Sequence, residues 1–275
     1  MGLLKIDEKK CKKDGICVRE CPATIIQLPA YDGYPDIVPG GEGMCLVCGH
    51  CVAVCPHNAL SHSGVPIENS PRIKKELLIN QRQAVQFLRS RRSIRLYQDK
   101  TVEKEKIQRL IEVARYAPTG GNSQLVEWLV LSDRSEIHKI ASLTAEWLRQ
   151  LLQNNPRLAA ARPYMPRIVA AWDAGNDSVL RNAPVLLVAS APVEAVNGMV
   201  DLALALSYLA LLAPTMGLGT CWAGLLQGAL LASPLTKETL GIPKEHPHHY
   251  PMMLGYPKVK HYRLPERKSP KVTFK

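Results

Sequence analysis

The chain has 275 residues and a formal net charge of +11, so it is long enough for a small domain beside a second one with a sizeable core. The positive charge favours acidic partners, phosphate groups or an acidic redox protein. It does not favour nucleic acid, because no basic stripe alternates with aromatic residues. Residues 1–7 show no charged segment followed by an apolar run, so no secretory signal is expected and the cytoplasm is the predicted compartment.

Seven of the 8 cysteines lie before residue 56, in two copies of one motif. The second copy follows the pattern C-x2-C-x2-C-x3-C-P and contains Cys45, Cys48, Cys51 and Cys55. The first copy lies 34 residues earlier (45 minus 11) and contains Cys11, Asp14, Cys17 and Cys21. This pattern holds iron–sulfur clusters in bacterial-type ferredoxins, where the fourth cysteine of each run binds the other cluster. We therefore predict two clusters within residues 1–60, in an organism that lives with little or no oxygen.

This crossed ligation predicts two ligand sets. One cluster would be held by Cys21, Cys45, Cys48 and Cys51. The other would be held by Cys11, Cys17 and Cys55, with Asp14 at the fourth corner. Zinc fits less well because it prefers two separated cysteine pairs, and covalent haem requires a C-x-x-C-H run that the chain lacks. Disulfides would require an oxidising compartment.

Asp14 leaves two interpretations open. A carboxylate is a harder ligand than a thiolate, but it still binds iron. The site is then either an aspartate-ligated [4Fe–4S] cluster or a [3Fe–4S] cluster with that corner empty. The alternative is that Asp14-Gly15 forms a surface turn with no ligand role.

After the cluster module, residues 61–72 are predicted to form a linker because Gly64, Pro66 and Pro71 interrupt a polar stretch. Residues 73–275 are predicted to form the larger domain. Apolar residues at near-helical spacing predict helices over residues 73–89 and 103–117, the second stopped by Pro118. A buried strand over 128–131 and a helix over 137–153 follow. Residues 154–177 are expected to be irregular, with two short helices.

The last third of the chain predicts a buried strand over 185–189, an apolar helix over 201–212, and a last strand over 250–255. Between them, 217–222 is a turn into a further strand or helix. Residues 202–233 carry no charge, but Pro214, Gly217, Gly219 and Gly224 interrupt the run, so a core or interface helix is expected instead of a membrane span. Helices that alternate with a few strands predict an α+β layered fold.

A basic run, Arg91-Arg92-Ser93-Ile94-Arg95, follows the first helix of this domain. Guanidinium groups at alternate positions of an extended chain point the same way and can clamp a phosphate group. Arg267 and Lys268 are candidates to join the same pocket. Taken alone, the run is better explained as a solvated basic face than as a phosphate site.

Four motifs occur in one order along the chain: 91–95, 117–124, 217–224 and 254–257. Together they resemble the nitroreductase family of flavoenzymes, and with the cysteine-rich segment the whole chain resembles the ferredoxin-fused members of that family. The resemblance implies an FMN-binding, three-layer α+β fold with a small ferredoxin-like domain in front. It also implies a homodimer with FMN at the subunit interface.

The same resemblance implies specific FMN contacts. Arg91, Ser93 and Arg95 would hold the phosphate and the ribityl chain, with Arg92 beside them. Asn122 and Gln124 would bond the isoalloxazine edge. The backbone around Trp222, Ala223 and Gly224 would lie near flavin N5, and Arg267 and Lys268 would approach the phosphate.

The predicted activity combines both cofactors. FMN accepts single electrons from clusters and passes on two, so we expect an FMN-dependent oxidoreductase that reduces a nitroaromatic or a related electrophilic small molecule. Two alternatives stay open: an electron-transfer protein that serves a ferredoxin- or flavodoxin-type partner, and an NAD(P)H-dependent nitroreductase with accessory clusters. No catalytic residue is predicted, because flavin chemistry needs no dedicated nucleophile.

Three further features receive structural interpretations. His246, His248 and His249 lie between prolines and are expected in a surface loop instead of a metal site. Cys221 is expected to be a buried small residue. Tyr164 and Trp172 either cover the flavin or pack in the core.

Overall fold

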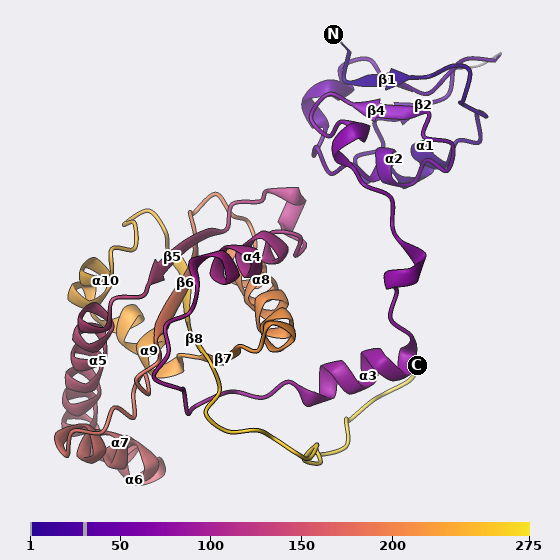
Figure 1. Cartoon of the computed structure of the whole chain (residues 1–275). Coiled ribbons are helices and arrows are strands. Elements are labelled where there is room, and N and C mark those ends of the chain that lie inside the picture. Colours follow the sequence, from indigo (N-terminus) through magenta and orange to yellow (C-terminus); the bar gives the residue numbers. More distant parts are fainter. Residues whose placement is uncertain (1, 30–31) are drawn as a thin grey trace. The chain divides into compact units, whose positions relative to one another are not determined.

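The computed structural model describes residues 2–29 and 32–275, and the chain divides into two compact units (Figure 1). The first unit comprises 1–79 together with 121–123, and the second comprises 80–120 together with 124–275. Each unit has its own hydrophobic core, so each is described by itself.

The first unit contains short elements only. Its strands are β1 (Leu4–Ile6), β2 (Ile26–Gln27), β3 (Asp36–Ile37) and β4 (Leu60–His62). Its helices are α1 (Ile16–Glu20) and α2 (His50–Ala53), with 3-10 turns η1 (Gly41–Met44), η2 (Ile67–Asn69) and η3 (Lys75–Leu77). Strand β1 pairs with β4 and β2 pairs with β3, both antiparallel. Strands β1 and β4 come from opposite ends of the cysteine-rich segment, and β2 and β3 come from its middle. Pairing of β1 with β4 brings the two cysteine runs into one body.

The 34-residue sequence repeat is also a repeat of backbone conformation. Left-handed φ angles recur at the same offset, in the pairs Lys13 and Val47, Gly15 and Gly49, and Thr24 and Asn58. The two glycines, at φ 69° and 71°, begin α1 and α2 respectively. Glycine adopts this region without the cost that a Cβ imposes. Each cysteine run therefore folds as the same loop followed by one helical turn or more.

The core of the first unit is built partly from its own cysteines. Cys17, Cys21 and Cys51 are buried in one cluster with Ile25, Ile26, Val52 and Leu60. So few aliphatic side chains bury little apolar surface, and domains of this size usually need metals or disulfides for stability. Folding of this unit is therefore expected to depend on what the cysteines bind.

The second unit is a four-stranded sheet between two helical layers. Its strands are β5 (Glu127–Leu131), β6 (Val185–Ala191), β7 (Gly219–Trp222) and β8 (His248–Gly255), in the antiparallel order β5-β6-β8-β7. Its helices are α3 (Gln81–Ser90), α4 (Lys104–Ala114), α5 (Arg134–Asn154), α6 (Pro156–Ala161), α7 (Tyr164–Asp173), α8 (Gly198–Leu212), α9 (Gly224–Ala232) and α10 (Pro234–Leu240), with the turn η5 (Ala213–Met216). The turn η4 (Gly120–Asn122) begins at the last residue before the 121–123 segment of the first unit.

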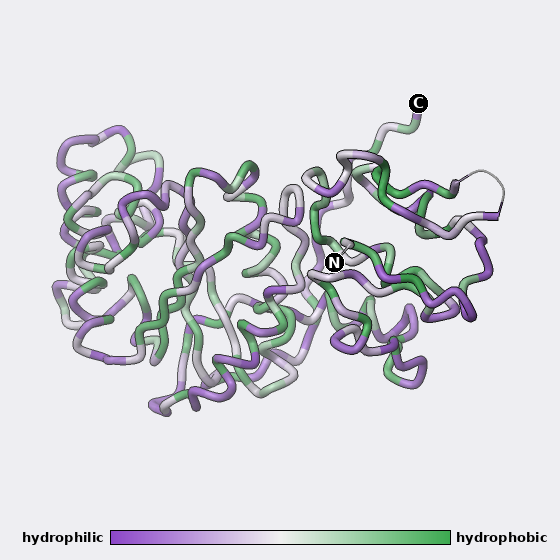
Figure 2. Tube along the Cα trace, turned by 90° about the horizontal axis from the view of Figure 1, so that it is seen from above, coloured by the Kyte–Doolittle hydropathy of each residue, from purple (hydrophilic) through white to green (hydrophobic). Residues whose placement is uncertain are grey.

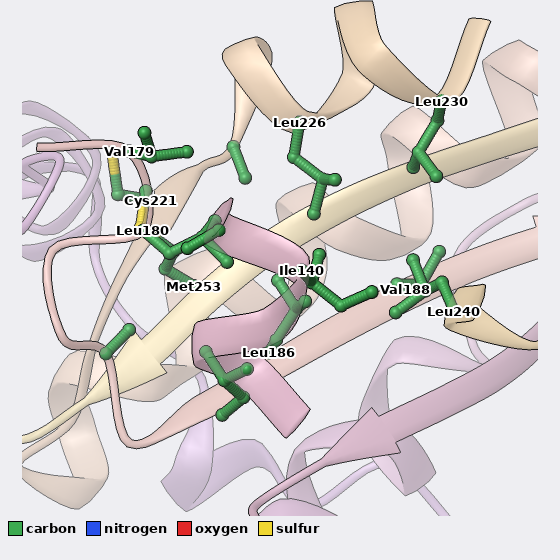
Figure 3. Close-up of a cluster of buried hydrophobic side chains, with 14 of the residues drawn as sticks. Ile140, Val179, Leu180, Leu186, Val188, Cys221, Leu226, Leu230, Leu240 and Met253 are labelled. Carbon is green, nitrogen blue, oxygen red and sulfur yellow. The ribbon is translucent and has the colours of Figure 1, made fainter. Parts of the chain in front are cut away.

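Alternate residues of the central strands pack against different helices. On one face, Leu186 and Val188 of β6 meet Ile140 of α5 and Leu226 of α9 (Figure 3). On the other face, Val185, Leu187 and Ala189 of β6 pack against α4 and α8. Strand β6 is buried at all of its residues, and six of its seven residues are apolar. Figure 2 shows hydropathy along the whole chain. The expected three-layer α+β fold is confirmed.

Two expectations were wrong in detail. The first helix of this unit was expected from Ile73, but α3 begins at Gln81. There the Asn80 side chain accepts from the Gln83 N–H and the Gln83 side chain accepts from the Asn80 N–H, forming a capping box. The histidine-rich stretch is not a surface loop, because His246 and His249 are only 4% and 3% exposed and β8 begins at His248.

One apolar stretch was expected to be a core or interface helix. Among the described residues, the helical stretch Gly198–Met216 is long and apolar enough to cross a membrane by length and composition, and 39% of that stretch is buried within the unit. Leu202, Leu206 and Leu209 of α8 are completely buried against the sheet. Met199, Val200 and Tyr208 of the same helix remain exposed.

Candidate functional site

The first unit contains two cavities, and each is lined by one of the two predicted ligand sets. The first cavity, of about 390 Å³ including space open to solvent, is lined by Cys21, Cys45, Cys48 and Cys51. The fold therefore carries the last cysteine of the first run across to the first three cysteines of the second run. Apolar side chains such as Leu4, Ile25 and Ile37 surround these thiols.

The second cavity mirrors the first. It has about 350 Å³, again including open space, and it is lined by Cys11, Asp14, Cys17 and Cys55. Cys55 comes from the second run and the other three residues come from the first run. These four residues are the ones that crossed ligation assigns to one cluster, and their role as ligands stays a prediction.

The donor chemistry of both cavities suits iron–sulfur clusters. Across residues 2–29 and 32–275, no three His, Cys, Asp or Glu side chains lie close enough to hold one metal ion. Each set of four donors instead surrounds a space, which is the arrangement that a cluster of several irons requires. Burial raises the pKa of the Cys51 thiol to about 11 and also raises that of Cys17. A thiol loses its proton when it binds metal, so bound iron would offset the cost of burying the thiolate charge.

Asp14 has contacts that suit both of its interpretations. It lines the second cavity, yet its Oδ1 also accepts a hydrogen bond of 3.1 Å from the Ile16 N–H. The latter contact closes an Asx turn at the start of α1. Its Oδ2 lies 3.6 Å from His57 Nε2. One carboxylate oxygen therefore supports the turn, and the ligand role stays a prediction.

In the second unit, the extended segment after α3 is fixed against strand β7. The Ile94 N–H donates to the Thr220 carbonyl at 2.8 Å, and Tyr97 bridges to Pro257. A Cβ on Gly219 would lie 2.3 Å from Ile94 Cγ1, so only glycine permits this close approach. Pairing with the sheet holds residues 92–95 extended and sends Arg92 and Arg95 to different sides.

A large cavity receives part of the predicted flavin set. About 1020 Å³ of space, open to solvent, is lined by Arg95 together with Trp222, Ala223 and Gly224. Arg92 lines a different cavity, with Gly219, Thr220 and Lys258. Arg91 and Ser93 are half-buried and line neither of these two cavities. The structure thus brings together Arg95 and the Trp222–Gly224 turn, but not the whole basic run.

The remaining predicted flavin residues lie elsewhere. Asn122 and Gln124 adopt left-handed φ angles of 55° and 52° in a tight loop. Just before this loop, the Gly120 N–H donates to the buried Asp201 of α8 at 3.0 Å. Arg267 and Lys268 lie in the exposed tail after β8 and line neither of the two cavities.

The cavity at Arg95 fits a group with negative charge, such as the phosphate or the reduced ring of FMN. The first turn of α9 begins at Gly224 without a side-chain cap, so its backbone N–H groups are free to bind an acceptor. No acidic side chain lines the cavity. Free backbone donors at the start of α9 are the groups that a bound cofactor would satisfy.

Three residues near these cavities were missed from the sequence. Arg162 and Arg181 line the same cavity as Arg95, and His62 lines the first cysteine cavity. The arginines stand in segments without a recognisable motif. Tyr164 lines the cavity at Arg95 and is 54% exposed, whereas Trp172 packs against the core and stacks on His138. Cys221 is buried, as expected.

Comparisons with known proteins agree with this division of the chain. A family model described as the nitroreductase family matches residues 88–256, more than half of the chain. A second model, described as a 4Fe-4S dicluster domain, matches residues 9–60. A protein of Archaeoglobus fulgidus, provisionally named NADH dehydrogenase/NAD(P)H nitroreductase, is 27% identical over 176 residues, which cover 64% of this chain and 86% of that protein.

Other relatives resemble one unit alone. Subunit I 2 of the NADH-quinone oxidoreductase of Streptomyces coelicolor is 30% identical over 74 residues, which cover 22% of this chain and 38% of that protein. Crystal structures of nitroreductases with bound FMN from Bacteroides fragilis and Desulfitobacterium hafniense share the fold. Each superposes with a TM-score of 0.56 at 18% identity. They cover 71% and 72% of this chain and 99% of their own length.

Proposed function

This chain belongs to the nitroreductase family of FMN-dependent oxidoreductases, and we propose that it delivers electrons from a donor through two iron–sulfur clusters and FMN to a nitroaromatic or related electrophilic small molecule. When bound, the clusters supply one-electron transfer and FMN supplies the conversion between single electrons and pairs. The observation that carries the proposal is the pair of cavities, each with four crossed donors, in the same chain as the nitroreductase domain.

The chain's own residues have distinct roles in this proposal. Cys21, Cys45, Cys48 and Cys51 hold one cluster. Cys11, Cys17 and Cys55 hold the other, with Asp14 at the fourth corner as a [4Fe–4S] ligand or beside a [3Fe–4S] cluster. We assign residues 1–60 to this domain, 61–72 to a linker and 73–275 to the flavin domain. Apolar side chains such as Leu4, Ile25 and Ile37 line the first cavity and would limit the access of water to its cluster.

Flavin binding is assigned to two groups of residues. Arg95 and the Trp222–Gly224 turn line one cavity and would orient the ring, with the free N–H groups of α9 directed to it. Arg91, Arg92 and Ser93 are assigned to the phosphate and ribityl chain. Asn122 and Gln124 are assigned to the ring edge, and Arg267 and Lys268 to the phosphate.

We further propose a homodimer with FMN at the interface. Helix α3 has no buried residue, although Val85 and Leu88 lie on it and are 45% and 57% exposed. Tyr262 and Phe274 of the C-terminal tail are 84% and 92% exposed. Exposed apolar side chains on α3 and on the tail favour association of two copies of the chain. A second copy would also bring another tail, with its Arg267 and Lys268, to the flavin. Sedimentation velocity of the holoprotein tests this, and a monomer with full flavin would overturn it.

The function is tested on protein purified without oxygen. Reduction by a low-potential ferredoxin should be followed by consumption of nitrobenzene, with the flavin and the clusters reoxidised together. Reduction by NADH at an equal rate in a cluster-free variant would favour the NAD(P)H-dependent alternative. Electron transfer to a partner protein without consumption of any nitro compound would favour the electron-transfer alternative.

A further inference from the structure

The cavity at the Trp222–Gly224 turn collects more positive charge than the predicted flavin set supplies. Arg95 reaches it from the extended segment, Arg162 from the junction of α6 and α7, and Arg181 from the loop before β6. No acidic side chain lines this cavity. Within the described part of the chain, none of the three guanidinium groups has an ion pair. Three unpaired cations in one cavity indicate a site for an anionic group.

Arg181 is held by a loop that appears nowhere in the predicted flavin motifs. Arg181 and Asn182 adopt left-handed φ angles of 60° and 50°, a conformation that costs roughly 1 kcal/mol or more per residue without glycine. The Asp177 carboxylate offsets this cost, because it accepts from the N–H groups of Val179, Leu180 and Asn182 at 2.8–2.9 Å. Among the described residues, no ion pair joins Asp177 or any other carboxylate to Arg181. The loop presents a free cation to the cavity.

Arg95 and Arg181 lie in the same electrostatic environment. Burial raises the pKa of the Tyr97 phenol, and the two guanidinium groups, Arg181 and Arg95, act in the opposite direction. Both charges therefore stand near one buried ring, although they come from segments more than eighty residues apart in sequence. Tyr164 and Trp222 line the same cavity and offer aromatic surface beside the cations.

We infer that Arg162 and Arg181 bind the carboxylate of the electron acceptor, so that the preferred acceptor is an aromatic acid instead of a neutral nitroaromatic. This inference rests on the proposed function, because it assumes that the flavin ring lies at the Trp222–Gly224 turn. Arg95 remains assigned to the flavin. The FMN phosphate is the other source of the same anionic chemistry, and the test separates the two.

The test compares two acceptors of one shape, nitrobenzene and 4-nitrobenzoate, in Arg162→Gln and Arg181→Gln variants. A charge-assisted hydrogen bond contributes about 1.5–3 kcal/mol, so KM for 4-nitrobenzoate should rise about 10- to 100-fold in each variant. KM for nitrobenzene should stay within about twofold of the starting enzyme. Arg167→Gln, at an exposed position on α7 outside this cavity, is the matched control and should change neither value.

Two outcomes overturn the inference. Loss of FMN from the Arg181→Gln protein would assign the site to the flavin phosphate, and equal effects on both acceptors would remove the carboxylate contact. Binding of benzoate to the oxidised holoprotein, measured by calorimetry, needs no turnover. If benzoate binds and both variants weaken it while no nitro compound is consumed, the anion site stands and the proposed acceptor class fails.

A second inference concerns His62, and it depends on a different observation. His62 is 3% exposed, lies at the end of β4 and lines the first cysteine cavity. Its Nδ1 accepts from the Gly64 N–H at 2.9 Å, and its Nε2 lies 3.4 Å from Cys45 Sγ. A ring nitrogen that accepts a hydrogen bond carries no proton, so the proton of the neutral ring is on Nε2. The imidazole therefore donates N–H to the Cys45 sulfur.

The two cavities differ in this contact. Cys45 Sγ also accepts from the Val47 N–H at 3.4 Å, which gives this sulfur two N–H donors. Position 62 of the second half corresponds to Leu28 in the first half, by the 34-residue offset, and leucine cannot donate. Gly64 belongs to the same arrangement, since a Cβ there would lie 2.7 Å from Val47 Cγ1. Hydrogen bonds to cluster sulfurs stabilise the reduced, more negative cluster.

We propose that His62 is a positioning residue that raises the reduction potential of the cluster held by Cys21, Cys45, Cys48 and Cys51. His62→Leu should move the potential of one cluster to a more negative value and leave the other unchanged. His62→Gln retains a side-chain N–H donor and should restore the potential at least in part. Both variants should keep the iron content of the starting protein.

A spectroscopic measurement on the unaltered protein tests the same contact without a variant that has to fold. Protein labelled with ¹⁵N-histidine, reduced and studied by pulsed EPR, should show coupling from one histidine nitrogen to the cluster. Absence of this coupling would overturn the proposal. An unchanged potential in His62→Leu protein with full iron would overturn it as well.

Discussion

The two units of this chain are stabilised in different ways. In the first unit the side chains that line the cofactor cavities, Cys17, Cys21 and Cys51, are also core residues, and the strands have only two or three residues each. In the second unit a complete sheet is covered on both faces by aliphatic side chains, and the cavity lies beside that core. Folding and cofactor binding should therefore be inseparable in the first unit and separable in the second.

The largest effect is expected when the first unit loses its iron. Cys51→Ser should remove at least one cluster, lower the iron content by about half or more, and make residues 1–79 at least about tenfold more sensitive to protease, because a buried ligand is lost. Iron analysis and limited proteolysis measure this. Cys221→Ser, also a buried cysteine but outside the repeat, should keep full iron. A first unit that resists protease without iron would show that its folding does not depend on cluster binding.

The second unit should tolerate loss of its cofactor. Replacing Arg91 and Arg95 together with alanine should weaken FMN binding by about 100-fold or more, since each guanidinium contributes about 1.5–3 kcal/mol to a charged partner. The thermal transition of the unit and the iron content should stay near their starting values. Flavin retained at one per chain after gel filtration would refute the assignment. Arg89→Ala, exposed on α3, is the control.

Asp14 gives a smaller and more local effect. Asp14→Cys should produce a cluster with four thiolate ligands, an altered EPR spectrum and an altered potential for one of the two clusters. Asp14→Asn keeps the acceptor for the Ile16 N–H but is a poorer iron ligand, so it separates the turn from the ligand role. If both variants leave the spectrum and the potential unchanged, Asp14 forms only the turn.

The smallest expected effect is a change with pH in the stability of the second unit, caused by Glu103. The hydrogen bond from Tyr256 lowers the pKa of the Glu103 carboxyl to about 2, below the ordinary value of 4.5. A carboxyl whose folded pKa is lowered stabilises the fold above pH 4.5, and this contribution disappears as the pH falls toward 2. Glu103→Gln should therefore lower Tm slightly at pH 7 and by less at pH 2.5. The same small decrease at both values would exclude an ionic contribution.

Periodic patterns were sufficient to predict much of the fold. The buried strand at β6, the helices α4 and α5 and the two short helices at α6 and α7 were all expected, because their apolar spacing or their prolines are local signals. The start of α3 was placed eight residues too early, since exposed apolar residues from Ile73 to Ile79 continued the pattern. The Asn80 and Gln83 capping box was the available signal.

Site residues were likewise predictable only where the sequence carries a local signal. The two cysteine cavities could be predicted because the repeat fixes both runs and crossed ligation connects them. Arg162 and Arg181 could not, since only the folded chain brings the loop before β6 beside Arg95. The burial of His246 and His249 was missed because their prolines suggested a loop, whereas β8 already begins at His248. His62 had one usable signal, a histidine where the other half has leucine.

The most direct test of this account is the cofactor content of protein purified without oxygen, followed by anaerobic reduction monitored by EPR and flavin absorbance. The account predicts about seven or eight irons and one FMN per chain, with EPR signals from both clusters and bleaching of the flavin. Seven irons would indicate an empty corner at Asp14, and eight would indicate a ligated one. Flavin with little iron, or iron without flavin, would contradict a two-cluster flavoenzyme.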